Sequence, residues 1–154
     1  MMSKVKDILS KKKVEEPIAE VEVKGHLYAF YGSLRKGQYN HDRAGLAKET
    51  YIKTVQIPGY KMYSLGAFPL IVRADKTFMV TVDLFAIQNE DLERGIHLME
   101  IGAGYERITH NIDGKDYYIY VYERATPGLH HVKTGDWAEW NATIKKNPAI
   151  LFGN

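Results

Sequence analysis

The stretch LYAFYGSLRKGQYNH, residues 27–41, has the residue types to bind an anion. An apolar run leads into Gly32 and Gly37, and the cations Arg35 and Lys36 lie between them. A strand that ends in such a loop presents backbone N–H groups suited to a carboxylate or a developing oxyanion. The glycines could equally serve only to permit a tight turn with positive φ. The spacing leaves both interpretations open.

Nucleotide binding is disfavoured by the same stretch. The phosphate-binding pattern G-x-x-x-x-G-K-[ST] is matched at Gly32 and Gly37, but Gln38 and Tyr39 stand where Lys and Ser or Thr are required. The dinucleotide pattern G-x-G-x-x-G has no match here. The loop therefore predicts neither kind of nucleotide site.

Glu100 is the second candidate for chemistry. It lies on the flank of an apolar stripe with helical spacing, formed by Leu92, Ile96 and Met99. It also lies in the last helical turn, just before Gly102 and Gly104, where the helix dipole disfavours an anion. Burial and the dipole would both raise its pKa toward the range of a general acid/base. The alternative is that Glu100 extends into solvent or pairs with Arg107.

Other catalytic chemistries find little support. The chain has no cysteine, which excludes disulfides, thiolate metal sites and cysteine nucleophiles. The six histidines, including His130 and His131, lack the spacing of metal ligands, so we expect no metal site. Ser33 has no G-x-S-x-G context, so a serine nucleophile is not expected.

Strands are expected to position the loop. An apolar run that hardly alternates predicts a first strand at residues 26–32, buried on both faces. The longest strand is expected at residues 77–87. Between them, residues 40–48 predict a short helix capped by Asn40, and residues 54–72 predict extended segments.

The second half of the chain predicts two helices separated by a hairpin. The first helix opens at Asn89, and the hairpin turns at Asp113–Gly114, a dipeptide suited to a type I′ turn. The last helix follows Asp136, which forms a possible capping box with Glu139. Because strands outnumber helices and connections are short, we expect an α+β domain with a curved or barrel-like sheet.

The composition is that of a single globular domain. The 154 residues are 45% hydrophobic and 26% charged. A net charge of +2, from 21 basic and 19 acidic residues, is too balanced for a typical nucleic-acid binder. No apolar run approaches roughly 18 residues, and no signal peptide is evident. We therefore expect no nucleic-acid or membrane partner and a cytoplasmic location.

The expected domain covers residues 26–146. Residues 1–25 are rich in Lys and Glu and are expected to form a charged arm, flexible or partly helical. Residues 147–154 are expected to form a C-terminal tail. The sequence does not reveal the oligomeric state.

Several motifs resemble those of a known family. YGSLRKGQYNH is similar to the pattern Y-G-[ST]-L-[KR]-x-G-x-x-N of the γ-glutamylcyclotransferase-like (AIG2-like) family, especially its γ-glutamylamine cyclotransferase branch. FPLIV resembles the family's aromatic-Pro-Leu strand. MEIGAGYERI resembles its L-x-x-[FHLM]-E…Y-x-R segment, with Leu98 shifted by one residue, and YVYERA resembles its closing strand. The resemblance covers roughly residues 27–125.

This resemblance implies a fold and an activity. The fold would be the family's small mixed β-barrel or curved sheet with flanking short helices. The enzyme would convert a small γ-glutamyl amide to 5-oxoproline and a free amine or amino acid, with no cofactor or metal. Glu100 would be the catalytic acid/base. The residues expected to bind the substrate are Tyr31, Gly32, Ser33, Leu34, Arg35 and Tyr105.

One strand departs from the family's pattern. Where relatives commonly have V-x-G-E, this chain has VTVD, with Val82 for glycine and Asp83 for glutamate. If the glycine gives room beside the site, Val82 narrows it and alters substrate acceptance. The alternative function is therefore a non-catalytic module that binds a small ligand or a protein on the same scaffold.

Overall fold

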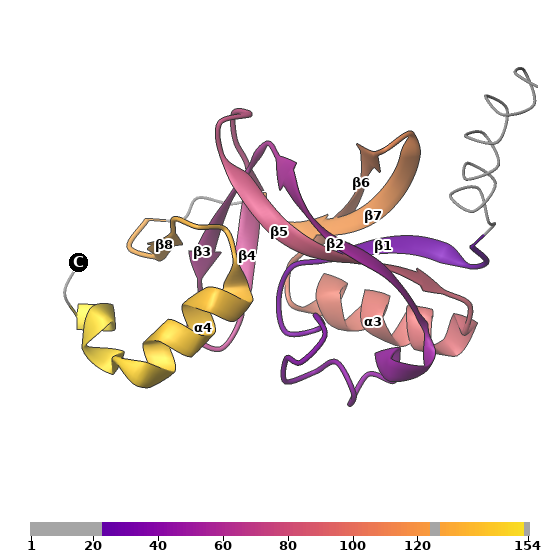
Figure 1. Ribbon diagram of the computed structural model, residues 1–154, viewed down its shortest axis with the longest axis horizontal. Helices are drawn as coiled ribbons and strands as arrows, with labels where there is room; N and C mark the ends of the chain where they lie inside the picture. The colour runs from indigo at the N-terminus through magenta and orange to yellow at the C-terminus, as the bar shows by residue number, and fades with distance from the viewer. Residues whose placement is uncertain (1–22, 124–126, 153–154) are drawn as a thin grey trace, which may run out of the picture.

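The computed structural model of the protein describes residues 23–123 and 127–152. These residues form two β-sheets, two α-helices and two short 3₁₀ helices, in a mixed α+β arrangement (Figure 1). The predicted fold class is confirmed. Most of the predicted N-terminal arm, residues 1–22, lies outside the described residues.

The larger sheet has five strands in the order β2-β5-β1-β7-β6. Its strands are β1 (His26–Phe30), β2 (Thr50–Pro58), β5 (Met79–Ile87), β6 (Glu106–Ile112) and β7 (Lys115–Val121). Strands β1 and β7 run parallel, and the other neighbours are antiparallel. Strand β5 is buried along almost its whole length, because both of its faces pack against apolar side chains.

The smaller sheet has three strands in the order β4-β3-β8. They are β3 (Tyr60–Ser64), β4 (Pro69–Arg73) and β8 (His130–Val132). The Tyr122 N–H donates a 2.8 Å hydrogen bond to the Ile71 carbonyl and so joins β4 to the end of β7. Within the described residues the edge strands β2 and β6 do not pair with each other. The predicted curved sheet is therefore confirmed, but the barrel does not close.

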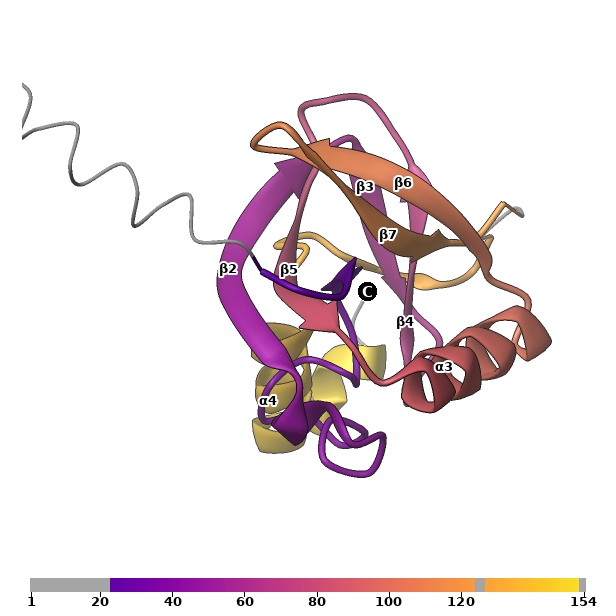
Figure 2. The same cartoon turned by 90° about the vertical axis from the view of Figure 1, so that its right-hand side faces the viewer.

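The two α-helices begin where their capping residues predict. Helix α3 (Glu90–Gly102) starts after Asn89, whose side chain accepts from the Leu92 N–H, and α4 (Trp137–Lys146) starts after Asp136, whose side chain accepts from the Glu139 N–H. Helix α3 lies along the five-stranded sheet, and α4 lies beside the smaller sheet (Figures 1 and 2).

The ends of the second hairpin and of the chain add detail. Asp113 and Gly114 both have positive φ, 53° and 84°, which confirms the predicted I′-type turn. After α4, residues Pro148–Phe152 form the 3₁₀ helix η2, and the Leu151 carbonyl lies 2.7 Å from His130 Nε2. This part of the predicted tail therefore packs on the domain.

The helix predicted at residues 40–48 is wrong in extent. Residues 40–45 form successive turns, and only Leu46–Lys48 form the 3₁₀ helix η1. Gly45 has a φ of +87°, a left-handed conformation that an α-helix cannot continue through. Asn40 is followed by turns and caps no α-helix.

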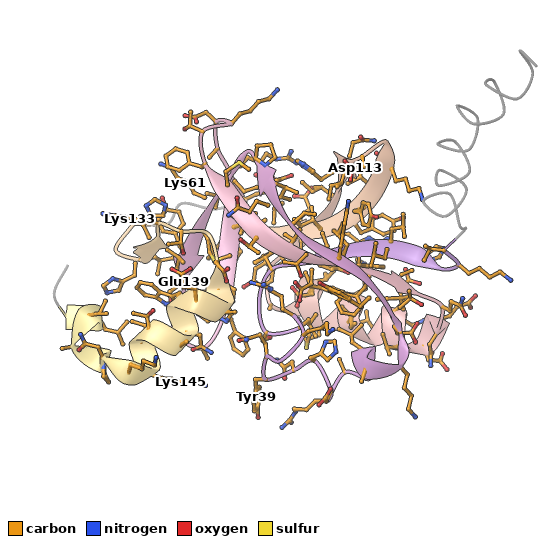
Figure 3. The ribbon with its side chains drawn as sticks, viewed as in Figure 1. Tyr39, Lys61, Asp113, Lys133, Glu139 and Lys145 are labelled. Carbon is orange, nitrogen blue, oxygen red and sulfur yellow. The ribbon has the colours of Figure 1, made fainter. Side chains whose placement is uncertain are left out.

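Two apolar cores lie on opposite faces of the large sheet. One is enclosed between the two sheets and includes Val82, Ile119 and Trp137. The other packs β1 and β5 against α3 and includes Tyr28, Phe85 and Ile96. Charged side chains such as Asp113 and Lys145 project from the outside of the molecule (Figure 3). No helix in the described part of the chain is long and apolar enough to cross a membrane.

Candidate active site

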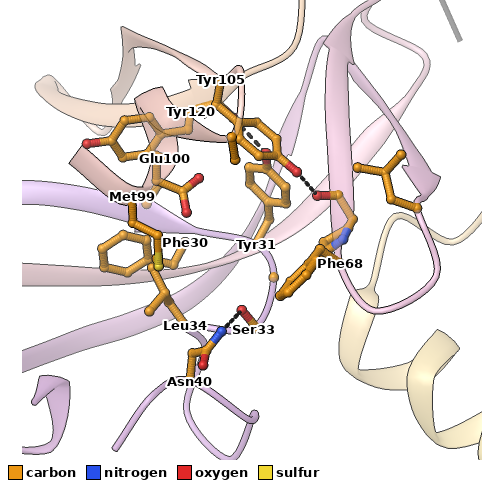
Figure 4. Close-up of a pocket in the computed structure, with 15 residues that line it drawn as sticks. Phe30, Tyr31, Ser33, Leu34, Asn40, Phe68, Met99, Glu100, Tyr105 and Tyr120 are labelled. Carbon is orange, nitrogen blue, oxygen red and sulfur yellow. Dashed lines mark hydrogen bonds between the residues drawn. The ribbon is translucent and has the colours of Figure 1, made fainter. Parts of the chain in front are cut away.

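A cavity of about 210 Å³ lies where three elements meet. Its lining comes from the end of β1 and the following loop (residues 29–34), from the β3–β4 turn and the start of β4 (residues 65–69), and from the C-terminal end of α3 (residues 99–103). Asn40, Tyr105 and Tyr120 complete it (Figure 4). Pockets for drug-sized ligands measure roughly 300–1,000 Å³. This cavity is smaller, so it suits a molecule below drug size.

The Glu100 carboxylate points into this cavity from the last turn of α3 (Figure 4). Within the described residues it has no hydrogen-bond donor, and no basic group lies within 4.0 Å of it. Burial raises its pKa from 4.5 to about 7. The carboxyl group is thus placed to change its protonation state near neutral pH.

Arg107, the alternative partner of Glu100, is engaged elsewhere. Its guanidinium donates to the Tyr28 hydroxyl at 3.0 Å and lies 4.1 Å from the centre of the Tyr118 ring. Glu93, rather than Glu100, is the acid of this cluster, because it accepts from the Tyr28 hydroxyl at 2.7 Å. The pairing of Glu100 with Arg107 is therefore not formed.

Tyrosines form fixed walls around Glu100. The Tyr31 hydroxyl donates to the Tyr120 carbonyl at 2.8 Å, and the Tyr105 hydroxyl donates to the Pro69 carbonyl at the same distance. Burial raises the pKa of both phenols, so they stay neutral. Burial also raises the pKa of Tyr120 to about 12, and its oxygen lies 2.9 Å from His97 Nδ1.

The Gly32 loop, residues 31–37, offers backbone donors at the cavity. Gly32, Ser33 and Leu34 line the cavity, and their N–H groups donate no hydrogen bond within the described residues. Asn40, which also lines the cavity, holds the loop in place, because its N–H donates to the Ser33 carbonyl and its Nδ2 donates to Ser33 Oγ, both at 2.9 Å. Unpaired N–H groups held in place can bind a carboxylate or an oxyanion.

Glycine at position 32 is required by a neighbouring side chain. A Cβ added there would lie 2.8 Å from Pro69 Cγ, which is closer than two nonbonded carbon atoms approach. The φ angle of Gly32 is not positive, so its backbone conformation alone does not require glycine. The tight-turn interpretation therefore applies to Gly37, with a φ of +82°, and not to Gly32. Contact with Pro69 brings the loop against β4.

Arg35 does not line the cavity. It is buried beneath the loop, where its Nη1 donates to Asp136 Oδ1 at 3.0 Å and its Nε lies 3.3 Å from Asp83 Oδ1. Asp83 also accepts from the Lys36 N–H at 2.9 Å and from the Thr54 hydroxyl at 2.7 Å. The ion pair of Arg35 with Asp83, together with the hydrogen bond from the Lys36 N–H to Asp83, thus anchors the Gly32 loop.

The structure therefore gathers all but one of the predicted site residues. Glu100 and five of the six residues expected to bind substrate line the cavity. Arg35 is the exception. Val82 lies in the core between the sheets and does not line the cavity, so it does not narrow it.

Nine of the residues that line the cavity were not among the predicted site residues, and four of these nine had been given another interpretation. Phe68 and Pro69 lie in a quoted motif but were interpreted only as a strand. Asn40 was interpreted as a helix cap, although it is the last fixed position of the loop motif. Met99 was assigned to the core by its spacing, yet it lines the cavity and 46% of its surface is exposed.

Comparison with known proteins places the chain in a family. Residues 28–139 match the family described as gamma-glutamyl cyclotransferase, AIG2-like, and the chain belongs to that family. The gamma-glutamylcyclotransferase family protein YtfP of Escherichia coli strain K12 is 30% identical over 109 residues, which cover 71% of this chain and 93% of that protein.

Solved structures share the fold. The crystal structure of the uncharacterized protein PH0828 from Pyrococcus horikoshii has a TM-score of 0.67 at 24% identity, covering 80% of this chain and 98% of that one. The solution NMR structure of protein ytfP from Escherichia coli has a TM-score of 0.59 at 26% identity, covering 75% of this chain and 98% of that one. The fold predicted from the family resemblance is thereby confirmed.

Proposed function

We propose that this protein is a cyclotransferase that converts a γ-glutamyl amide to 5-oxoproline and a free amine. The observation that carries the proposal is the Glu100 carboxyl group, which is largely buried and has no partner among the described residues, in a cavity that also presents the N–H groups of residues 32–34. Membership of the family supports the reaction class. The γ-glutamylamine branch is part of this proposal.

The reaction begins with a proton transfer to Glu100. The α-ammonium group of the substrate loses a proton to the carboxylate, and its nitrogen then attacks the γ-carbonyl carbon. A carbon–nitrogen bond closes the five-membered ring, and the carbonyl oxygen becomes an oxyanion. The unpaired N–H groups of Gly32, Ser33 and Leu34 are the donors available to stabilise that charge.

The reaction ends with the return of the proton. The oxyanion reforms the carbonyl, and the bond to the original amide nitrogen breaks as protonated Glu100 gives its proton to that nitrogen. The ring nitrogen loses its second proton, so that the neutral lactam of 5-oxoproline forms and the amine leaves as an ammonium ion. A pKa of about 7 suits both transfers, because a group that titrates near the working pH can accept and donate a proton. The tyrosine walls hold the substrate in the folded shape that ring closure needs.

Asp83 and Val82 do not argue against activity. Asp83 supports the Gly32 loop through Lys36, and Val82 packs in the core away from the cavity. The non-catalytic binding module therefore has no specific structural feature in its favour.

The proposal is tested with the Glu100→Gln variant. Parent and variant are incubated with a panel of γ-glutamyl amides, and 5-oxoproline is followed by mass spectrometry. We expect product from the parent and a loss of at least about a hundredfold in rate for Glu100→Gln. The matched control is Glu106→Gln, an exposed glutamate on β6 outside the cavity, which should keep the parent's rate. An equally active Glu100→Gln variant, or a folded parent that forms no 5-oxoproline, would contradict the proposal.

A further inference from the structure

The mouth of the cavity carries large apolar side chains on two sides. Leu65 and Phe68 come from the β3–β4 turn, and Met99 comes from α3. Their surfaces are 48%, 48% and 46% exposed. Figure 4 shows Phe68 and Met99 on opposite sides of the cavity, with Glu100 next to Met99. Exposed apolar side chains that gather at a cavity mark a binding surface.

This apolar mouth is held in shape by its own turn. The Leu65 N–H donates to the Phe68 carbonyl at 2.8 Å, and the Gly66 N–H donates to Ser64 Oγ at 3.0 Å. Pro69, the next residue, is fixed by the Tyr105 hydroxyl on its carbonyl. The exposed side chains are therefore presented by an ordered backbone that also forms the cavity wall.

Among the described residues, Glu100 is the only charged side chain at the cavity. Among the described lining residues there is no Lys, Arg or His, and Glu100 is the only carboxylic acid. Arg35 directly follows the lining residue Leu34, but it forms ion pairs with Asp83 and Asp136. A second carboxylate on the substrate would lose its hydration at the mouth without gaining a partner, and a second ammonium group would do the same.

We propose that the group attached to the γ-amide nitrogen of the substrate is an uncharged alkyl or aryl group, which packs against Leu65, Phe68 and Met99. This inference rests on the proposed function and specifies the leaving group. Amides of amino acids, which carry a carboxylate there, and isopeptides of lysine, which carry two charges, are disfavoured. The γ-glutamyl end of the substrate lies toward Glu100 and the N–H groups of the Gly32 loop.

The test uses three γ-glutamyl amides of matched length. Their amine parts are pentylamine, 5-aminopentanoate and 1,5-diaminopentane, which end in a methyl group, a carboxylate and an ammonium group. We expect kcat/KM for the pentylamide to exceed that for each charged amide on the order of tenfold or more, because only the methyl end keeps favourable contacts at the mouth. Each rate is measured as 5-oxoproline released.

A pair of variants on α3 assigns the preference to the cavity mouth. Met99→Gln should reduce the preference for the pentylamide several-fold, because it places a polar group against the substituent. The control is Leu98→Gln, at the neighbouring residue, which is 64% exposed and outside the cavity lining. It should keep the parent's preference. Circular dichroism shows whether each variant is folded.

The possible failures are distinguishable. If the parent releases 5-oxoproline from all three amides with similar kcat/KM, the leaving-group inference is overturned while the proposed function stands. The same holds if a charged amide is preferred. If the folded parent releases 5-oxoproline from none of the three nor from the wider panel, the proposed function is contradicted, and the inference falls with it.

Discussion

The Glu100 side chain has an unusual environment for a carboxylate. Burial removes part of its hydration, and no donor or cation within the described residues replaces it. The ionised form therefore carries a free-energy cost that the unfolded chain does not have. A change in pKa from 4.5 to about 7 corresponds to about 3 kcal/mol at most.

The cost predicts how stability depends on pH. Because the folded pKa of Glu100 is higher than the unfolded value, the folded state binds more protons between about pH 4.5 and 7, and stability falls as pH rises through that window. Glu100→Gln cannot ionise, so it should lack this fall and become more stable than the parent at about pH 8, by up to about 3 kcal/mol. Urea unfolding at several pH values measures the difference.

The control for the pH dependence of Glu100→Gln is a variant at an exposed glutamate. Glu106→Gln, at an exposed glutamate, should retain the parent's decrease in stability. If the parent and Glu100→Gln show the same pH dependence from about pH 4 to pH 8, Glu100 has no raised pKa.

At the residue scale, local spacing predicted the position of Glu100 but not its partners. Its place beside an apolar stripe follows from helical periodicity, which is a property of neighbouring residues. The engagement of Arg107 by Tyr28, and of Arg35 by Asp83, depends on strand pairing between distant segments. Sequence spacing carries no information on such contacts, so Arg35 was expected in the site and lies beneath it.

At the element scale, Asp83 of β5 holds the Gly32 loop in position. The carboxylate is almost fully buried and has Arg35, Lys36 and Thr54 as partners. These contacts connect the loop to the centre of the sheet, and Arg35 connects it to the cap of α4 through Asp136. The shape of the loop thus depends on a residue outside the cavity.

Asp83→Asn should therefore destabilise the protein by about 3 kcal/mol, because it removes one of the two carboxylates that pair with the buried Arg35 and leaves Asp136 as the other. Asp113→Asn is the matched control, since the Asp113 side chain is 72% exposed and pairs with Lys53 in solvent. Its cost should stay below about 1 kcal/mol. Chemical denaturation of the two variants gives both values. Equal losses would contradict the anchoring role of Asp83.

The contact between the Gly32 loop and β4 predicts that a side chain at position 32 lowers stability. Gly32→Ala places a methyl group 2.8 Å from Pro69 Cγ, so the loop or β4 must move, at a cost of about 1–3 kcal/mol. Gly95→Ala, inside α3, meets nothing within 4 Å and should stabilise by about 0.5–1 kcal/mol through helix propensity. Thermal unfolding checks both signs. A neutral Gly32→Ala variant would show that the loop tolerates a side chain.

Elements with strong local signals were predicted well. Asn89 and Asp136 cap the two α-helices, and Asp113–Gly114 forms the expected turn, because each depends on a few adjacent residues. Residues 40–48 were predicted as a short helix with Asn40 as its cap, but Gly45 lies in the left-handed region and Asn40 bonds to Ser33, so turns form instead. Tertiary contacts overrode the local preference there.

At the scale of the whole molecule, the two sheets share one core. Residues from both, including Val82, Met62 and Val132, pack with Trp137 of α4. The Thr81 N–H of β5 also donates to the Gly135 carbonyl at 2.8 Å, which attaches the segment before α4 to the large sheet. Neither sheet has a complete core without the other.

The shared core predicts a single cooperative unfolding transition. Tryptophan fluorescence reports Trp137 and Trp140 near the small sheet, and far-ultraviolet circular dichroism reports all the strands and helices. In urea, both signals should have the same midpoint, because the core between the sheets is lost in one step. Separate midpoints would show that α4 and the small sheet unfold independently of the large sheet.

The order of the strands was not accessible from the sequence. Periodicity indicated strands and an α+β class, but the parallel pairing of β1 with β7 joins segments far apart in the chain. Nor did periodicity show that the edge strands β2 and β6 do not pair within the described residues, which leaves the barrel open. The family resemblance predicted a mixed barrel or curved sheet but gave no strand order, which only the structure shows.

The most direct test of the account follows the oxygen atoms of the product. The protein is incubated with a γ-glutamyl amide in water labelled with heavy oxygen, and the products are analysed by mass spectrometry. Intramolecular attack predicts unlabelled 5-oxoproline and free amine in equal amounts, because no water enters the product. Glutamate with heavy oxygen in its γ-carboxylate would show hydrolysis by water and would contradict the cyclisation by Glu100 proposed for this site.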